Sequence, residues 1–251
     1  MKKLIVFIYL ACLPFFFSSA YGQNKEGQII YTETIKFDID LPEAAKAYAD
    51  LIPKEQKSKN ILFFDETDSI YKPYEGGDDE VIERGEAGGM MTMVIQRPEY
   101  QVYKEMNKEM MLTKQEFMGR AFLIDSPFEN HNWKISGESK KILDYNCIKA
   151  TLQDTSKTVV AWFTPQIPVS NGPGSYHKLP GMILELDINE GKRTLLAEKV
   201  TLTPNEKGTI TKPKKGKKVS RAEYEKIVEE KTKEMEEQTG GSGSFQIQVR
   251  N

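Results

Sequence analysis

The stretch VVAWFTPQIPVSNGPGSYHKLPGMILEL, residues 159–186, decides how this chain folds. Its apolar ends, Val159–Phe163 and Met182–Leu186, are typical of two sheet strands. The residues between them are rich in proline, which fixes φ and removes an N–H donor, and in glycine, which reaches positive φ. We therefore expect one rigid loop of defined shape between the strands. Its prolines and glycines are Pro165, Pro168, Gly172, Pro173, Gly174, Pro180 and Gly181.

This loop is the candidate interaction site of the protein. It contains no nucleophile beside a base, no metal-ligand spacing and no phosphate-binding loop, so its chemistry favours recognition over bond-making. We expect it at the rim of the sheet, with Tyr176, His177 and Leu179 exposed to a partner or an apolar ligand. The candidate interaction residues are Pro168, Gly172, Pro173, Tyr176, His177, Leu179, Pro180 and Gly181.

Strand-like segments recur on both sides of the loop. Residues 27–39, GQIIYTETIKFDI, alternate apolar and polar side chains, as a half-buried strand does. Residues 133–142 and 144–153 suggest a bent or bulged hairpin, and residues 182–188 and 194–203 suggest a second hairpin around Asn-Glu-Gly-Lys. Short strands at this spacing predict a mainly β fold with minor α content: a single curved or partly closed antiparallel sheet with a C-terminal helix. The other predicted strands lie within 61–74, 90–95, 100–106 and 120–125.

The two ends of the chain differ in composition from this β-rich part. The N-terminus has Lys2 and Lys3, an apolar run shorter than a membrane span, and small residues at Ala20 and Gly22, which predicts a signal peptide cleaved before Gln23. Near the other end, Ser220 and Glu223 form a capping-box pattern that opens a helix. The predicted organisation is a signal peptide at 1–22, a β-rich domain at 23–204, a basic linker at 205–219, a helix at 220–239, and a Gly/Ser spacer with a terminal strand at 240–251.

Charge and cysteine content exclude several classes of protein. The formal net charge is −2, and cleavage would remove two lysines, so nucleic acid is not an expected partner. Cys147 would be the only cysteine left after cleavage, which rules out an intrachain disulfide. We expect a periplasmic protein, or one on the periplasmic face of the outer membrane, with no transmembrane segment in the mature chain and no cofactor.

Sulfur and imidazole side chains offer two alternative functions. Methionines crowd residues 90–118, and thioethers favour Cu(I), so a soft-metal site is one alternative; core packing explains the same methionines. The other alternative is a hydrolase in which Cys147 is the nucleophile and His131 or His177 is its base. This alternative rests only on the presence of both residue types. No residues stand at a spacing typical of metal ligands, so none is assigned to a metal site. The possible copper ligands are Met91, Met93, Met106, Met110, Cys147 and a histidine.

The loop also carries a family resemblance. Gly172-Pro173 and the hexapeptide KLPGMI, residues 178–183, together with the GQIIY strand, Trp133, DYNCIKA and AWFTPQIPVSNGP, resemble the GLPGLI family of exported Bacteroidetes proteins. The resemblance spans most of residues 27–203. Lys178 and Asp144 stand where the family pattern has glycine, and a lysine at positive φ would cost about 1 kcal/mol. The resemblance implies a β-rich, periplasmic or outer-membrane-associated protein of unassigned activity, and it brings no catalytic residues.

The expected function is therefore a non-catalytic binding or interaction protein. Its partner would be a periplasmic or outer-membrane protein or an apolar ligand, recognised by the loop. Copper binding is the alternative.

Overall fold

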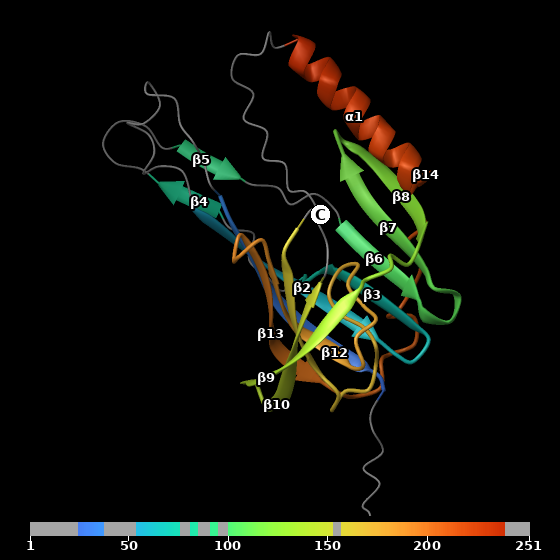
Figure 1. Ribbon diagram of the computed structural model, residues 1–251. Coiled ribbons are helices and arrows are strands. Elements are labelled where there is room, and N and C mark those ends of the chain that lie inside the picture. The colour runs from blue at the N-terminus through green and yellow to red at the C-terminus, as the bar shows by residue number, and fades with distance from the viewer. Residues whose placement is uncertain are drawn as a thin grey trace, which may run out of the picture.

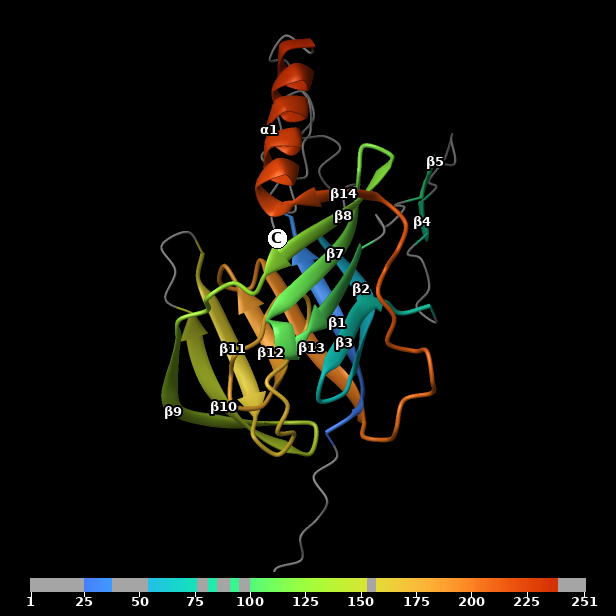
Figure 2. The same ribbon diagram turned by 90° about the vertical axis from the view of Figure 1, so that its right-hand side faces the viewer.

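One large curved sheet forms the body of the protein (Figures 1 and 2). The computed structural model describes residues 25–37, 54–75, 81–84, 91–94, 100–152 and 157–238. Twelve strands are ordered β14-β8-β7-β6-β3-β2-β1-β13-β12-β11-β10-β9. Neighbouring strands are antiparallel except β14 and β8, which are parallel. The predicted mainly β fold, with one curved sheet and a C-terminal helix, is confirmed. The sheet is not closed, and its one parallel pair makes it mixed and not purely antiparallel.

The strands match the predicted segments closely. A separate two-stranded sheet is formed by β4, Val81–Arg84, and β5, Met91–Val94. A single 3-10 turn, η2, covers Met106–Lys108. The strands of the large sheet are β1 Gly27–Lys36, β2 Glu55–Phe64, β3 Asp68–Pro73, β6 Tyr100–Glu105, β7 Met110–Phe117, β8 Arg120–Pro127, β9 Trp133–Ile142, β10 Tyr145–Leu152, β11 Val159–Thr164, β12 Met182–Ile188, β13 Arg193–Thr201 and β14 Lys217–Ser220.

Both predicted hairpins are present. The β9–β10 pair shifts register between Ile148 and Ala150, so the hairpin is bulged as expected. Its turn places Leu143, not Asp144, at positive φ (52°). The β12–β13 hairpin turns through Asn189 and Glu190 at φ 54° and 56°.

Three strands were not predicted: β4, β7 and β14. The sequence of β7 does not alternate between apolar and polar residues, because the polar residues Thr113 and Lys114 are both buried in this strand. β14 lies inside the segment expected to be a solvated basic linker. Its backbone pairs with β8, and Val219 is buried against Phe122 and Ile124, so its flanking lysines stay in solvent.

The helix α1, Arg221–Gln238, begins as predicted. The Ser220 hydroxyl accepts a hydrogen bond from the Glu223 backbone N–H at 3.2 Å, and the Glu223 carboxylate accepts one from the Ser220 N–H at 2.7 Å. Tyr224 is buried against the β8 side of the sheet, whereas Met235 is 38% exposed. Only the first part of the helix therefore packs on the sheet, and the rest extends away from it (Figures 1 and 2).

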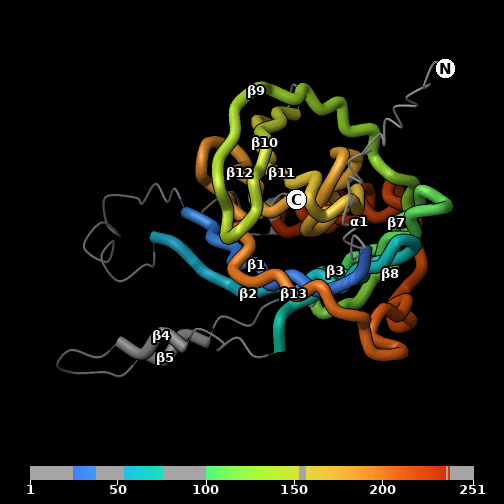
Figure 3. The backbone as a smooth tube through the Cα atoms, turned by 90° about the horizontal axis from the view of Figure 1, so that it is seen from below, coloured from blue at the N-terminus to red at the C-terminus, as the bar shows by residue number. Residues whose placement is uncertain are grey.

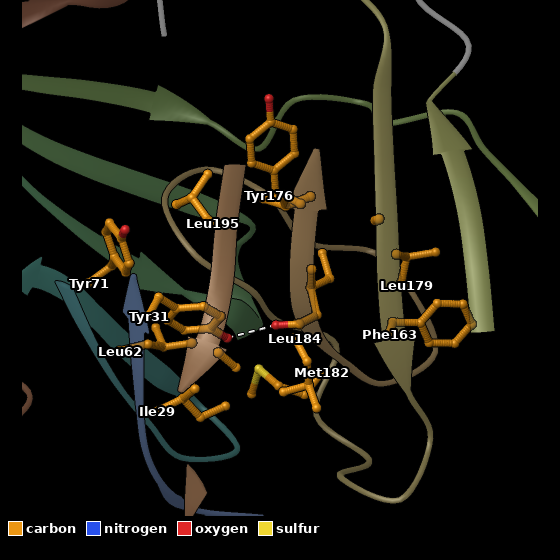
Figure 4. Packing of buried hydrophobic residues seen from close by; sticks show 14 of the residues in the cluster. Ile29, Tyr31, Leu62, Tyr71, Phe163, Tyr176, Leu179, Met182, Leu184 and Leu195 are labelled. Atoms are coloured by element: carbon orange, nitrogen blue, oxygen red, sulfur yellow. Dashed lines mark hydrogen bonds between the residues drawn. The ribbon is translucent and has the colours of Figure 1, made fainter. Parts of the chain in front are cut away.

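The core fills the concave side of the sheet. Seen from below, the sheet curls around the 165–181 loop, with β9 and β10 on one side and β1 to β3 on the other (Figure 3). Ile29 and Tyr31 of β1, both fully buried, point into this core (Figure 4), which confirms the predicted alternation of that strand. The loop thus closes the apolar face that a curved sheet would otherwise leave open to water.

Some predicted features lie outside the described residues. These are the signal peptide at 1–22 and the Gly/Ser spacer with its terminal strand at 240–251. No helix in the described part of the chain combines the length and apolarity that a membrane span requires.

Candidate functional site

The 165–181 loop lies inside the curve of the sheet and not at its rim. Tyr176, His177 and Leu179 are 7%, 1% and 1% exposed, so the prediction that they are exposed is wrong. The apolar side chains of Ile167 and Val169 also join the core. An apolar concave face and an apolar loop remove more surface from water by packing together than by staying apart, which explains the position of the loop.

Side chains from distant strands donate hydrogen bonds to backbone carbonyls of the loop and of the start of β12. The Tyr31 hydroxyl donates to the Ile183 carbonyl at 2.7 Å across the concave face (Figure 4). The Trp133 indole N–H donates to the His177 carbonyl at 2.8 Å. The Lys104 amine donates to the carbonyls of Gly172 at 2.7 Å and Tyr176 at 3.2 Å. These bonds satisfy carbonyl groups that a buried loop cannot pair with water.

Lys104 is the least expected member of this set. It belongs to β6 and is fully buried, and removal from water lowers the pKa of its amine to about 7. A neutral amine keeps two N–H donors, which matches the two carbonyl oxygens that it binds. The residue therefore serves as an anchor for the loop in either protonation state.

Glycine is required where the loop turns. At Gly181, with φ 150°, a Cβ would lie 2.2 Å from the Thr164 carbonyl oxygen. At Gly172, a Cβ would lie 2.8 Å from the Ile183 side chain. Lys178 has φ 68°, so the position where the GLPGLI pattern has glycine is in the left-handed region, as expected.

His177 is held as a neutral imidazole. Its Nδ1 lies 2.7 Å from the Ser175 carbonyl oxygen, so Nδ1 carries the proton. Burial lowers the pKa of His177 to about 3, and the nearby Lys104 amine adds to the effect. Its Nε2 is an acceptor with no partner among the described residues. The Phe128 ring packs against the imidazole at 4.1 Å between centroids.

One side of the loop forms a wall of an open groove of about 320 Å³. Of the candidate residues, Pro168 and His177 line it, while Pro180 is exposed elsewhere and the others are packed inside or beside the core. Its lining combines apolar side chains with charged side chains of both signs. The groove residues are Lys25, Glu66, Met106, Glu109, Phe128, Pro168, Val169, Ser170, His177 and Lys178.

Sequence reasoning missed the groove residues outside the loop. Met106 and Glu109 come from η2 and its C-terminal end, and Phe128 follows β8. They meet the loop only because β6, β7 and β8 place their connections beside it. The backbone bond from the Phe128 N–H to the Glu109 carbonyl, 2.7 Å, fixes two of these segments together.

The sulfur side chains that the structure describes lie in separate surroundings. Met111 is in the core, Met106 lines the groove, and Met118 is 49% exposed at a hairpin tip, so the methionines have different surroundings. Cys147 is fully buried, and desolvation raises the pKa of its thiol to about 11. Its sulfur contacts the Tyr145 carbonyl. The described residues contain no group of three or more His, Cys, Asp or Glu side chains that could hold a metal ion.

The fold defines a class of open, curved β-sheet proteins that includes part of PNGF-II. A crystal structure of PNGF-II in space group P21 matches with a TM-score of 0.52 and 13% identity, covering 81% of this chain and 33% of that chain. The C2 crystal form gives a TM-score of 0.52 at 13% identity, with 81% and 32% covered. This chain thus spans about a third of the length of PNGF-II, and the likeness shows the fold alone.

The sequence itself matches one family over a short segment. The family model is described as "Protein of unknown function (Porph_ging)", and it matches residues 153–185. That segment includes β11, the whole 165–181 loop and the first residues of β12. No curated protein matches the chain.

Proposed function

We propose that this chain is an exported, non-catalytic binding protein of the GLPGLI type, and that the groove beside the 165–181 loop receives a segment of a partner protein. One observation carries the proposal: a loop fixed by buried hydrogen bonds presents Pro168, His177 and Lys178 as one wall of a 320 Å³ groove. A wall that is already ordered costs little entropy to bind against.

The composition of the groove supports a protein partner. The apolar lining residues Met106, Phe128, Pro168 and Val169 are buried or partly buried, whereas the charged lining residues Lys25, Glu66, Glu109 and Lys178 are exposed. An apolar centre within a polar rim is the usual pattern of a protein interface. The rim carries both signs of charge, with Lys25 paired to Glu66, so it suits a partner segment with mixed charges rather than a polyanion.

The chemistry of the buried groups supports a non-catalytic role. A thiol with a raised pKa is a poor nucleophile, and a histidine whose pKa is lowered to about 3 has little basicity at neutral pH. The short family match includes the KLPGMI hexapeptide, which supports the assignment to the GLPGLI type.

The experiment compares partner capture by two arginine variants. Ser170→Arg places a long cation in the groove from an exposed position, and Ser139→Arg makes the same change at an exposed position on β9. Both variants are cross-linked in periplasmic extract from the native cell and analysed by mass spectrometry. A protein captured by the wild type and by Ser139→Arg but lost with Ser170→Arg supports the groove. Equal capture by all three contradicts it.

Export has its own test. Intact mass and N-terminal sequencing of the protein from the native cell should give a chain that begins at Gln23. A chain that retains Met1 would contradict export with cleavage.

A further inference from the structure

A second, smaller hollow lies between the loop, the sheet and the start of α1. Its volume is about 140 Å³. Ser175 lines it, and Ser175 is two residues from His177, which lines the larger groove, so the loop contributes to both. The residues of this polar pocket are Tyr100, Thr113, Gln115, Glu129, Lys157, Ser175, Arg221 and Glu225.

The polar pocket is lined by charges that are balanced but not paired with each other. Arg221 and Glu225 are one turn apart on α1, and Lys157 and Glu129 come from the connections flanking the β9–β10 hairpin. No ion pair joins any two of these four side chains in the described structure. The Lys157 ammonium lies over the Tyr176 ring, 5.6 Å from its centroid. The pocket is therefore lined by two cationic and two anionic side chains that form no ion pairs with each other. Such a lining suits a ligand that carries one positive and one negative charge.

From these observations we infer that the polar pocket binds a small zwitterion of the α-amino-acid class. Arg221 and Lys157 bind its carboxylate, and Glu129 and Glu225 bind its ammonium group. Gln115 contacts a short polar side chain. The small volume limits the ligand to a single amino acid with a short side chain. This site is separate from the groove and does not depend on the function proposed for it.

Calorimetric titration with three probes tests the ligand class. The probes are L-serine, N-acetyl-L-serine, which lacks the ammonium group, and L-serinamide, which lacks the carboxylate. L-serine should bind saturably, and each derivative should bind at least about tenfold more weakly, which corresponds to about 1.4 kcal/mol. Absence of saturable binding of L-serine at millimolar concentration overturns the inference. Equal binding of either derivative overturns the zwitterion class.

Single variants of the full chain test the location. Arg221→Gln and Glu225→Gln should each weaken L-serine binding by at least about tenfold. Lys226→Gln is the matched control, because Lys226 is on the same helix with its side chain 75% exposed and paired to Glu230. Unchanged binding in Arg221→Gln and Glu225→Gln places the ligand elsewhere and overturns the site.

Discussion

The amine nitrogen of Lys104 lies 2.7 Å from the carbonyl oxygen of Gly172, to which it donates a hydrogen bond. This contact joins a fully buried lysine on β6 to a loop that is 68 residues further along the chain. It explains how a lysine can remain in an apolar interior: its donors are used by carbonyls that have no access to water. The stability of the protein should therefore respond to this one side chain and to its protonation.

Lys104→Met should destabilise the protein, because it leaves the carbonyls of Gly172 and Tyr176 buried without a donor. A loss of about 2 kcal/mol in the free energy of unfolding is expected at pH 9, where the folded wild type holds a neutral amine. Urea denaturation followed by tryptophan fluorescence measures it. An unchanged unfolding midpoint would show that Lys104 does not hold the loop.

The same lysine makes stability depend on pH. Its pKa is about 7 in the folded protein against an ordinary 10.5, so between these values the unfolded chain binds more protons than the folded one. Stability therefore rises with pH across this window. The difference in unfolding free energy between wild type and Lys104→Met should widen from pH 7 to pH 10. A constant difference would mean that the amine titrates normally.

His177 should make the protein sensitive to acid. Its pKa of about 3 lies below the ordinary 6.5, so the unfolded chain again takes up the proton first, and stability falls as the pH drops from 6.5 toward 3. His177→Asn retains a donor for the Ser175 carbonyl but does not titrate. The variant should lose stability less steeply between pH 6.5 and 4 in thermal melts, and parallel wild-type and variant curves would contradict this assignment.

Lys178→Gly should stabilise the protein by about 0.5 to 1 kcal/mol, because glycine adopts the left-handed φ of 68° without the steric cost that lysine has. Lys178→Ala is the control, since it removes the side chain and keeps the strain. Thermal unfolding should rank glycine above both lysine and alanine. A melting temperature for the glycine variant at or below that of the alanine variant would show that the turn relaxes.

Gly181→Ala should be strongly destabilising, because a Cβ would lie 2.2 Å from the Thr164 carbonyl oxygen and the backbone would have to move. A loss above about 2 kcal/mol is expected. Gly137→Ala on β9, where a Cβ meets nothing within 4 Å, should change stability by less than about 0.5 kcal/mol. Similar midpoints for the two variants in urea would contradict the close approach at Gly181.

Local patterns in the sequence predicted much of the fold. The alternation in β1, the two hairpins and the Ser220–Glu223 capping box are set by residues close together in the chain, so they can be read without knowing the tertiary structure. β7 and β14 were missed because neither follows such a pattern. β7 buries Lys114, and β14 buries only Val219 among exposed lysines.

The position of the loop could not be predicted in the same way. Prolines and glycines indicated its rigidity, but they are equally common in exposed turns. What places it inside is a pair of contacts to its carbonyls from Lys104 and Trp133, which are 68 and 44 residues away along the chain. The Tyr31 hydroxyl fixes the adjoining β12 through the Ile183 carbonyl, 152 residues away. The groove and the polar pocket depend on that placement, so neither was visible in the sequence.

The pairing of β1 with β13 also determines when the chain can fold. β1 pairs on one side with β2, which follows it closely in the chain, and on the other side with β13, residues 193–201. The hydrogen bond from the Tyr31 hydroxyl also requires the distant Ile183 carbonyl. A core built from such distant partners has a high contact order, so its completion is a slow step that comes after the polypeptide has been made nearly to its end.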